Sequence, residues 1–277
     1  MRISYHAWKA YKECPKKFYL EFFKRAKPTV PPNDYHRLYG VVVQKFFEMF
    51  CNIWRFKTPH LFPEVIEERL ELLWESTLIS NEVNWSAPHQ LSKKELFDKA
   101  LKDICAIMGS TGQNYFLNTQ SEVSIELKLK TQHVLTGRLD FVHADYLAGN
   151  STVIFDGKGT DKIGKNIDNN QLYFYALLYY LSSSKIPDTL GIFYYQLNSF
   201  IPIFFNLEIL NEFRAKLSLD IKEMTGRESF TATPCAKSCK YCKYIIGCQE
   251  GTESKAKRAR KSKLSDIDGE GVIELVF

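Results

Sequence analysis

The spacing of apolar side chains divides the chain into a helical first part and a mixed second part. Up to about residue 117 the apolar positions recur every three or four residues, as on a helix with one buried face. Pro15 disfavours helical backbone at Cys14, so we expect a break there. The pattern predicts helices after Ser4, then to about residue 25, and over 37–56, 63–79 and 92–117.

After residue 120 the period changes from about 3.6 to two. Apolar residues from Val123 to Leu129 alternate with polar ones, which is typical of a half-buried strand. The next segments are predicted as strand 133–144, a turn at 149–150, strand 152–158, helix 171–181, strand 190–197 and helix 207–224. This order predicts an α/β fold, with a mixed central sheet, flanking helices and a helical insertion before it.

Composition supports one large folded domain with a tail. Of the 277 residues 45% are hydrophobic and 14% aromatic, which excludes wholesale disorder. We expect one domain over 1–250, divided into a helical part at about 37–118, a core at about 119–226 and a Cys-rich segment at 235–248. Residues 251–277 differ in composition and are predicted to be a tail.

Two patterns bear on location. The apolar runs are shorter than the roughly 18 to 20 residues that cross a bilayer, so we expect no membrane partner. The first residues lack an apolar stretch and a small-residue cleavage site, which favours a cytoplasmic protein.

Positive charge is concentrated at the start of the chain. The net charge is +5, but residues 1–40 hold nine Lys or Arg against three acids, and 235–248 adds three Lys without an acid. Two basic segments suit a polyanion such as nucleic acid if the fold brings them together. The alternative is that these side chains are simply solvated.

The predicted strands carry two carboxylates and a lysine. Asp140 ends the sequence Gly-Arg-Leu-Asp, and sixteen residues later comes Asp156-Gly157-Lys158. Side chains at i and i+2 of a strand share a face, so Asp156 and Lys158 should point the same way. Carboxylates that hold Mg²⁺ or Mn²⁺ beside an ammonium suit phosphodiester hydrolysis. The alternative is that Asp156-Gly157 is only a hairpin turn and Asp140 a surface acid.

Gln171 and Tyr175 lie four residues apart on the next predicted helix, and therefore on one face. An amide and a phenol there suit contact with a phosphate or a base, although core packing is the alternative.

The seven cysteines are unevenly placed. Cys239, Cys242 and Cys248 lie within ten residues, Cys235 lies just before them, and Cys14 lies more than 220 residues upstream. In a reducing compartment this spacing favours metal ligation over disulfides, with zinc and an iron–sulfur cluster both open. Cys51 and Cys105 fall on apolar helix faces and are expected to be buried core residues.

Together these motifs resemble a known family. The segment from Ser4 to Tyr19, Gly137–Asp140, Asp156–Lys158, the Gln171/Tyr175 pair and the Cys trio resemble the RecB-like, iron–sulfur branch of the PD-(D/E)XK nucleases. Its members include AddB-type nuclease domains and RecB-like exonucleases of CRISPR adaptation. The resemblance covers about residues 3 to 248 and implies a restriction-endonuclease-like core that cleaves DNA.

The resemblance also implies roles for single residues. It makes Asp140 and Asp156 the ligands of Mg²⁺ or Mn²⁺ and Lys158 the catalytic lysine, with Gln171 and Tyr175 on the DNA side. The [4Fe–4S] cluster that it implies would be held by Cys14, Cys239, Cys242 and Cys248, with Cys235 outside the set. The family often has a His where this chain has Gln44, four residues after Gly40. An amide oxygen ligates or hydrogen-bonds a hydrated metal but does not titrate.

Three functions are compatible with these residues. We expect a metal-dependent DNA nuclease, an exonuclease acting on single strands or ends in recombination, replication or repair. The alternatives are a catalytically silent DNA-binding scaffold of the same fold and a zinc-dependent nucleic-acid-binding adaptor. No P-loop motif is present, so any unwinding would come from a partner.

The tail combines two kinds of residue. Residues 255–263 hold six Lys or Arg, which predicts salt-sensitive DNA affinity. The stretch 264–277 is acidic and ends in apolar residues. It is interpreted either as an edge strand or as a docking peptide for a replication or recombination protein.

Overall fold

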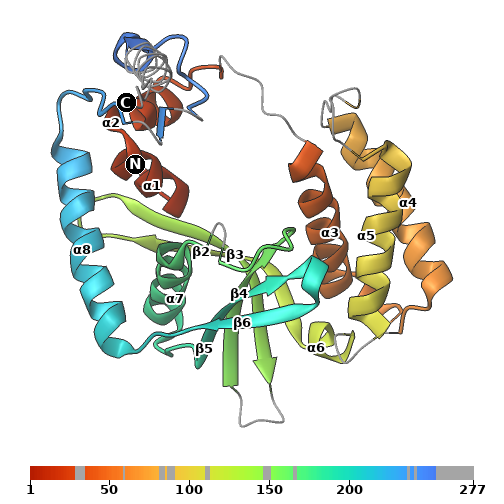
Figure 1. Ribbon diagram of the computed structural model, residues 1–277. Helices are drawn as coiled ribbons and strands as arrows, with labels where there is room; N and C mark the ends of the chain where they lie inside the picture. Colours follow the sequence, from red (N-terminus) through yellow and green to blue (C-terminus); the bar gives the residue numbers. More distant parts are fainter. Residues whose placement is uncertain are drawn as a thin grey trace, which may run out of the picture. The chain divides into compact units, whose positions relative to one another are not determined.

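The computed structural model describes residues 1–28, 35–58, 60–80, 85, 91–109, 113–145, 151–164, 167–235, 238–239 and 242–253 (Figure 1). Contacts divide the chain into two compact units. The first comprises residues 1–5 and 33–218, and the second comprises residues 6–32 and 219–277. The tail predictions for 255–263 and 264–277, and the turn at 149–150, lie outside the described residues.

A mixed sheet forms the centre of the first unit. Its strands are β1 (Arg2–Ile3), β2 (Thr119–Lys128), β3 (Val134–Asp145), β4 (Ser151–Lys158), β5 (Thr189–Tyr194) and β6 (Ser199–Ile203). They lie in the order β1-β3-β4-β5-β6, with β2 also paired to β3. The β1–β3 and β4–β5 pairs are parallel, and the other pairs are antiparallel. The parallel β4–β5 connection passes through helix α7 (Asn169–Ser183).

Helices flank this sheet. Helix α7 packs against β3 at Gly137, where a Cβ would overlap Leu178. The aromatic core joins the sheet to other helices, with ring centroids 4.4 Å apart for Phe47 and Phe116 and 4.8 Å apart for Phe141 and Phe155. Neighbouring Ile154 is also fully buried, so both faces of β4 are covered. The α-helices of the first unit that precede β2 are α3 (Tyr35–Asn52), α4 (Pro63–Ser80), α5 (Lys93–Ile107) and α6 (Gln113–Leu117).

The predicted α/β fold is confirmed, with differences in detail. The break at Cys14 is confirmed, because α1 (Tyr5–Glu13) ends before it and α2 (Pro15–Phe18) begins after it. The single helix predicted over 92–117 is wrong, since α5 ends at Ile107 and α6 is separate. Two predicted segments end in short 3-10 helices. The helix predicted over 37–56 ends in η2 (Trp54–Phe56), and the strand predicted over 190–197 ends in η4 (Tyr195–Leu197). The sequence pattern also missed β1 and β6, the second of which contains Pro202.

The second unit joins the two ends of the described chain. It contains most of α1, α2, the π-helix η1 (Tyr19–Phe23) and the last part of α8 (Leu207–Gly226). Buried Asp220 on α8 accepts hydrogen bonds from Trp8 Nε1 at 2.9 Å and Lys12 Nζ at 2.8 Å. Beside them, the Tyr11 hydroxyl donates to Glu223 at 2.8 Å. These contacts hold α1 to the end of α8.

None of the described helices is both long and apolar enough to cross a membrane.

Candidate active site

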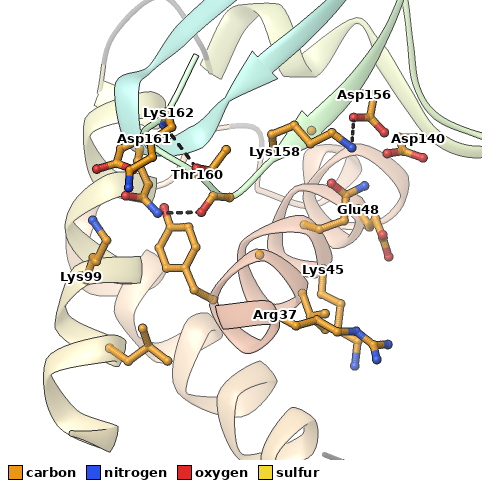
Figure 2. A pocket seen from close by; sticks show the side chains of 18 of the residues that line it. Arg37, Lys45, Glu48, Lys99, Asp140, Asp156, Lys158, Thr160, Asp161 and Lys162 are labelled. Carbon is orange, nitrogen blue, oxygen red and sulfur yellow. Dashed lines mark hydrogen bonds and ion pairs between the residues drawn. The ribbon is translucent and has the colours of Figure 1, made fainter. Parts of the chain in front are cut away.

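A large cavity in the first unit is lined by the four predicted catalytic residues, Gln44, Asp140, Asp156 and Lys158. Its volume is about 1120 Å³, and residues of α3, α5, β2, β3, β4 and the segment after β4 line it. Figure 2 shows Asp140, Asp156 and Lys158 together at one end, with Lys99 and Lys162 further along. The charged lining residues are Arg37, Lys45, Lys99, Arg138, Lys158, Lys162, Glu48, Glu122, Asp140, Asp156 and Asp161. A cavity with cations around a carboxylate cluster suits a polyanion and a divalent cation.

Asp156 and Lys158 meet at the end of β4. The Lys158 ammonium lies 2.6 Å from Asp156 Oδ2, and only 3% of Asp156 is exposed. Both residues lie within the strand, so the interpretation of Asp156-Gly157 as a hairpin turn is wrong. The period-two geometry of the strand places the pair on one face, as the spacing predicts.

Asp140 lies beside Asp156 on the neighbouring strand. Pairing of β3 with β4 ends at Phe141 and Phe155, which are the chain neighbours of Asp140 and Asp156. Burial raises the pKa of Asp140 well above its ordinary value, and so do the charge of Asp156 and a hydrogen bond between the two carboxyls. A cation bound beside the two carboxylates would offset this charge repulsion.

Two further acids line this end of the cavity, and the sequence reasoning missed both. Glu122 on β2 has a left-handed backbone with φ +56°, which is uncommon for a residue other than glycine. Its neighbours Ser121 and Val123 pair with Phe141 and Leu139, which places Glu122 opposite Asp140. Burial, together with its neighbour Glu48, raises the pKa of Glu122 to about 7.

For Glu48, the sequence does contain a signal that could have identified it as a site residue. It lies four residues after Gln44, and so on the same face of α3. Glu122 gives no comparable signal, because nothing in the sequence indicates its left-handed backbone. Arg138 forms an ion pair with Glu122 and lies on β3, two residues before Asp140.

Gln171 and Tyr175 lie against Asp156. Gln171 Nε2 is 3.0 Å from Asp156 Oδ1 and 3.2 Å from the Tyr175 hydroxyl. Tyr175 is buried, which raises the pKa of its phenol above the ordinary value. The pair therefore reaches the acidic centre from α7 and fixes one oxygen of Asp156.

Gln44 lies in the cavity against Tyr195. The buried Tyr195 hydroxyl donates a hydrogen bond to Gln44 Oε1. A Cβ at Gly157, between Asp156 and Lys158, would overlap this hydroxyl and lie 2.8 Å from Gln44 Oε1. The strand that carries the reactive pair thus closes directly onto Gln44 and Tyr195, and glycine is required there.

A second glycine contact brings α3 to the end of β4. A Cβ at Gly159 would lie 2.8 Å from Cα of Gly40, one turn before Gln44. Gln196 Nε2 donates to the Gly159 carbonyl at 2.6 Å and holds the chain there. The two backbones therefore touch without an intervening side chain.

The predicted cluster ligands lie in the second unit. Cys14, Cys239, Cys242 and Cys248 line one cavity of about 30 Å³. Cys235 does not line it. This residue is exposed, and its Sγ accepts the Ser238 backbone N–H at 3.3 Å. Of the remaining two, Cys51 is buried and Cys105 half-buried.

Among the described residues, no three His, Cys, Asp or Glu side chains stand close enough together to share a metal ion. In chemical type, the carboxylates around Asp140 fit a hard divalent cation that keeps several waters. The thiols fit a softer metal or an iron–sulfur cluster.

The mixed sheet flanked by helices carries an Asp–Lys pair on one strand and a second acid beside it. The profile of the PD-(D/E)XK nuclease superfamily matches residues 2–249, and the chain belongs to that superfamily. No curated protein matches the sequence. Among solved structures, the crystal structure of SSO0001 is similar at 11% identity and a TM-score of 0.33, over 76% of this chain and 94% of that one.

Proposed function

We propose that this protein is a metal-dependent DNA nuclease that hydrolyses phosphodiester bonds in the cavity of the first unit. One observation carries the proposal: Asp140, Asp156 and Lys158 converge at one end of a cavity that six Lys and Arg side chains line. Membership of the nuclease superfamily supports hydrolysis. The preference for single strands or DNA ends, in recombination, replication or repair, rests on the RecB-like resemblance alone.

The proposal gives each residue a task. Asp140 and Asp156 would hold Mg²⁺ or Mn²⁺, which supplies positive charge and Lewis acidity next to the scissile phosphate. Lys158, 2.6 Å from Asp156, would offset the negative charge that develops on the phosphate oxygens. Gln171 fixes Asp156 from the side of α7.

A cleavage assay with paired variants tests this function. Single strands and duplexes labelled at the 5′ or 3′ end are incubated with Mg²⁺ or Mn²⁺, and products are resolved by length. Asp156→Asn should abolish cleavage. Asp161→Asn removes an exposed acid from the same cavity and should leave it unchanged. The order in which labelled products appear distinguishes an exonuclease from an endonuclease.

The silent-scaffold alternative predicts a different result. Wild-type protein would then bind DNA without cleaving any of these substrates under either metal. Cleavage that survives Asp156→Asn would instead show that the assigned site is wrong.

We also propose that the Cys cavity holds a [4Fe–4S] cluster. The support is that Cys14, distant in sequence, lines the same cavity as Cys239, Cys242 and Cys248. Anaerobically purified Cys14→Ser should lose iron, while Cys235→Ser keeps it. Iron in neither variant nor wild type, with one equivalent of zinc instead, would favour the zinc alternative.

For the tail, the proposed replication or recombination partner is tested by deletion of residues 264–277. Loss of a cross-linked partner with unchanged melting temperature supports docking, and a lower melting temperature supports the edge strand.

A further inference from the structure

Only one of the two polar atoms in the Gln44 side-chain amide has a hydrogen-bond partner among the described residues. Tyr195 donates to Oε1, but Nε2 is buried and has no hydrogen-bond partner among the described residues. A buried donor without a partner is costly, and in native structures such a group calls for an explanation. Gln44 also lines the cavity of Asp140 and Asp156, so a ligand bound there would lie next to it.

The amide is held in this orientation from two sides. Tyr195 is 1% exposed, and its ring stacks on Phe47 at 5.5 Å between centroids. Gly157 packs against the Tyr195 hydroxyl and Gln44 Oε1, which leaves no room for the amide to move toward β4. The oxygen already accepts one hydrogen bond within the protein, whereas the nitrogen has no partner among the described residues and is the group left for a ligand.

We infer that Gln44 Nε2 donates a hydrogen bond to an anionic oxygen of the substrate phosphate, that Tyr195 positions it, and that Gln44 is not a metal ligand. The N–H end of an amide is repelled by a cation and attracted by a phosphate oxygen. A donor fixed before the substrate arrives stabilises charge that develops during the reaction. This inference rests on the proposed nuclease function.

Metal binding without DNA separates a donor from a ligand. Mn²⁺ is titrated into the full chain by calorimetry, with wild type, Gln44→Met and Tyr195→Phe compared. A donor predicts the same Mn²⁺ affinity within about twofold for all three. A ligand predicts at least tenfold weaker binding for Gln44→Met. Because Tyr195→Phe would free the oxygen, it would bind Mn²⁺ more tightly if Gln44 were a ligand.

Turnover supplies the second readout. Gln44→Met should lower kcat by about 10²- to 10³-fold, the usual effect of removing a donor to developing charge. Tyr195→Phe, which only releases the amide, should lower kcat by about tenfold. Gln44→Glu keeps the shape and places an anion beside the phosphate, so it should be at least as inactive as Gln44→Met. Wild-type turnover in Gln44→Glu would overturn the inference.

Asp156→Asn distinguishes the two proposals. If it abolishes cleavage while Gln44→Met does not, only the role of Gln44 is wrong. If neither variant lowers cleavage, the proposed active site itself is wrong. Melting temperatures of the variants show whether any loss reflects unfolding, and the Mn²⁺ titration decides the question for every variant that folds.

Discussion

At the scale of single residues, the acidic centre is a local source of instability. Asp140 lies beside Asp156, which pairs with Lys158, and Glu122 lies beside Glu48 and pairs with Arg138. Like charges at this separation favour protonation and reduce the free energy of unfolding of the metal-free protein. Such local conflict is expected where a sequence serves function rather than folding.

Asp140→Asn should therefore stabilise the metal-free chain while it abolishes cleavage. We expect a gain of about 1 kcal/mol at pH 8, or roughly 2–4 °C in melting temperature. The gain should shrink as the pH is lowered from 8 to 5, because protonation of the wild-type carboxyl removes the same repulsion. Thermal melts with chelator at both pH values measure it. Destabilisation by Asp140→Asn at pH 8 would contradict the raised pKa.

Glu122 predicts how the free energy of unfolding depends on pH between about 4.3 and 7. Its pKa rises from about 4.3 in an unfolded chain to about 7 in the folded protein, so the folded state binds more protons between these values. The contribution of Glu122 to the free energy of unfolding thus falls as pH rises from about 4.3 through 7. In Glu122→Gln this fall should be smaller, as urea unfolding at pH 5.5, 7 and 8 would show. A curve parallel to wild type would refute it.

At the scale of elements, the sequence pattern predicts the features that periodicity determines. The switch from a period near 3.6 to two locates β2, β3 and β4, and Asp156 and Lys158 fall on one face as expected. The features that it misses depend on tertiary contacts. β6 contains Pro202, which is tolerated because the strand lies at the edge of the sheet. Glu122 was missed because its backbone is left-handed, and no residue type in the sequence predicts that conformation there.

The packing of strand β4, which carries Asp156 and Lys158, can be tested by a steric substitution at Gly157. Gly157→Ala would place a methyl group on the Tyr195 hydroxyl, so it should cost about 1–3 kcal/mol and lower cleavage sharply. Adding Tyr195→Phe should recover part of the stability, because the hydroxyl is removed. Gly226→Ala at the end of α8, where an added Cβ would meet no described atom within 4 Å beyond its chain neighbours and the adjacent helix backbone, is the matched control and should be neutral. Equal urea midpoints for both Ala variants would refute the packing argument.

At the scale of the whole molecule, the division into two units predicts that a substitution in one unit lowers the stability of that unit alone. The second unit carries its own buried network, in which Asp220 accepts from Trp8 and Lys12. Removing this acceptor takes the Asp220 hydrogen bond from the buried Trp8 N–H, which typically costs about 1–3 kcal/mol, whereas the exposed Lys12 ammonium is solvated.

Asp220→Ala should therefore lower the stability of the second unit by that amount and leave the first unit intact. Urea unfolding followed by hydrogen exchange at α1 and at β4 reports each unit separately. Exchange should accelerate at α1 and not at β4. The exposed, otherwise similar Glu208→Ala on α8 is the control. Equal acceleration at both elements would show that the units unfold together.

The contact between Gly40 and Gly159 has a consequence for how this cavity tolerates change. Because two backbones touch there, a direct backbone contact limits how closely α3 approaches the end of β4. Substitutions of lining residues such as Lys99 or Lys162 then alter what the cavity admits while the reaction centre keeps its dimensions. Under the proposed nuclease function, substitutions in this lining would therefore change substrate preference more than the cleavage step itself.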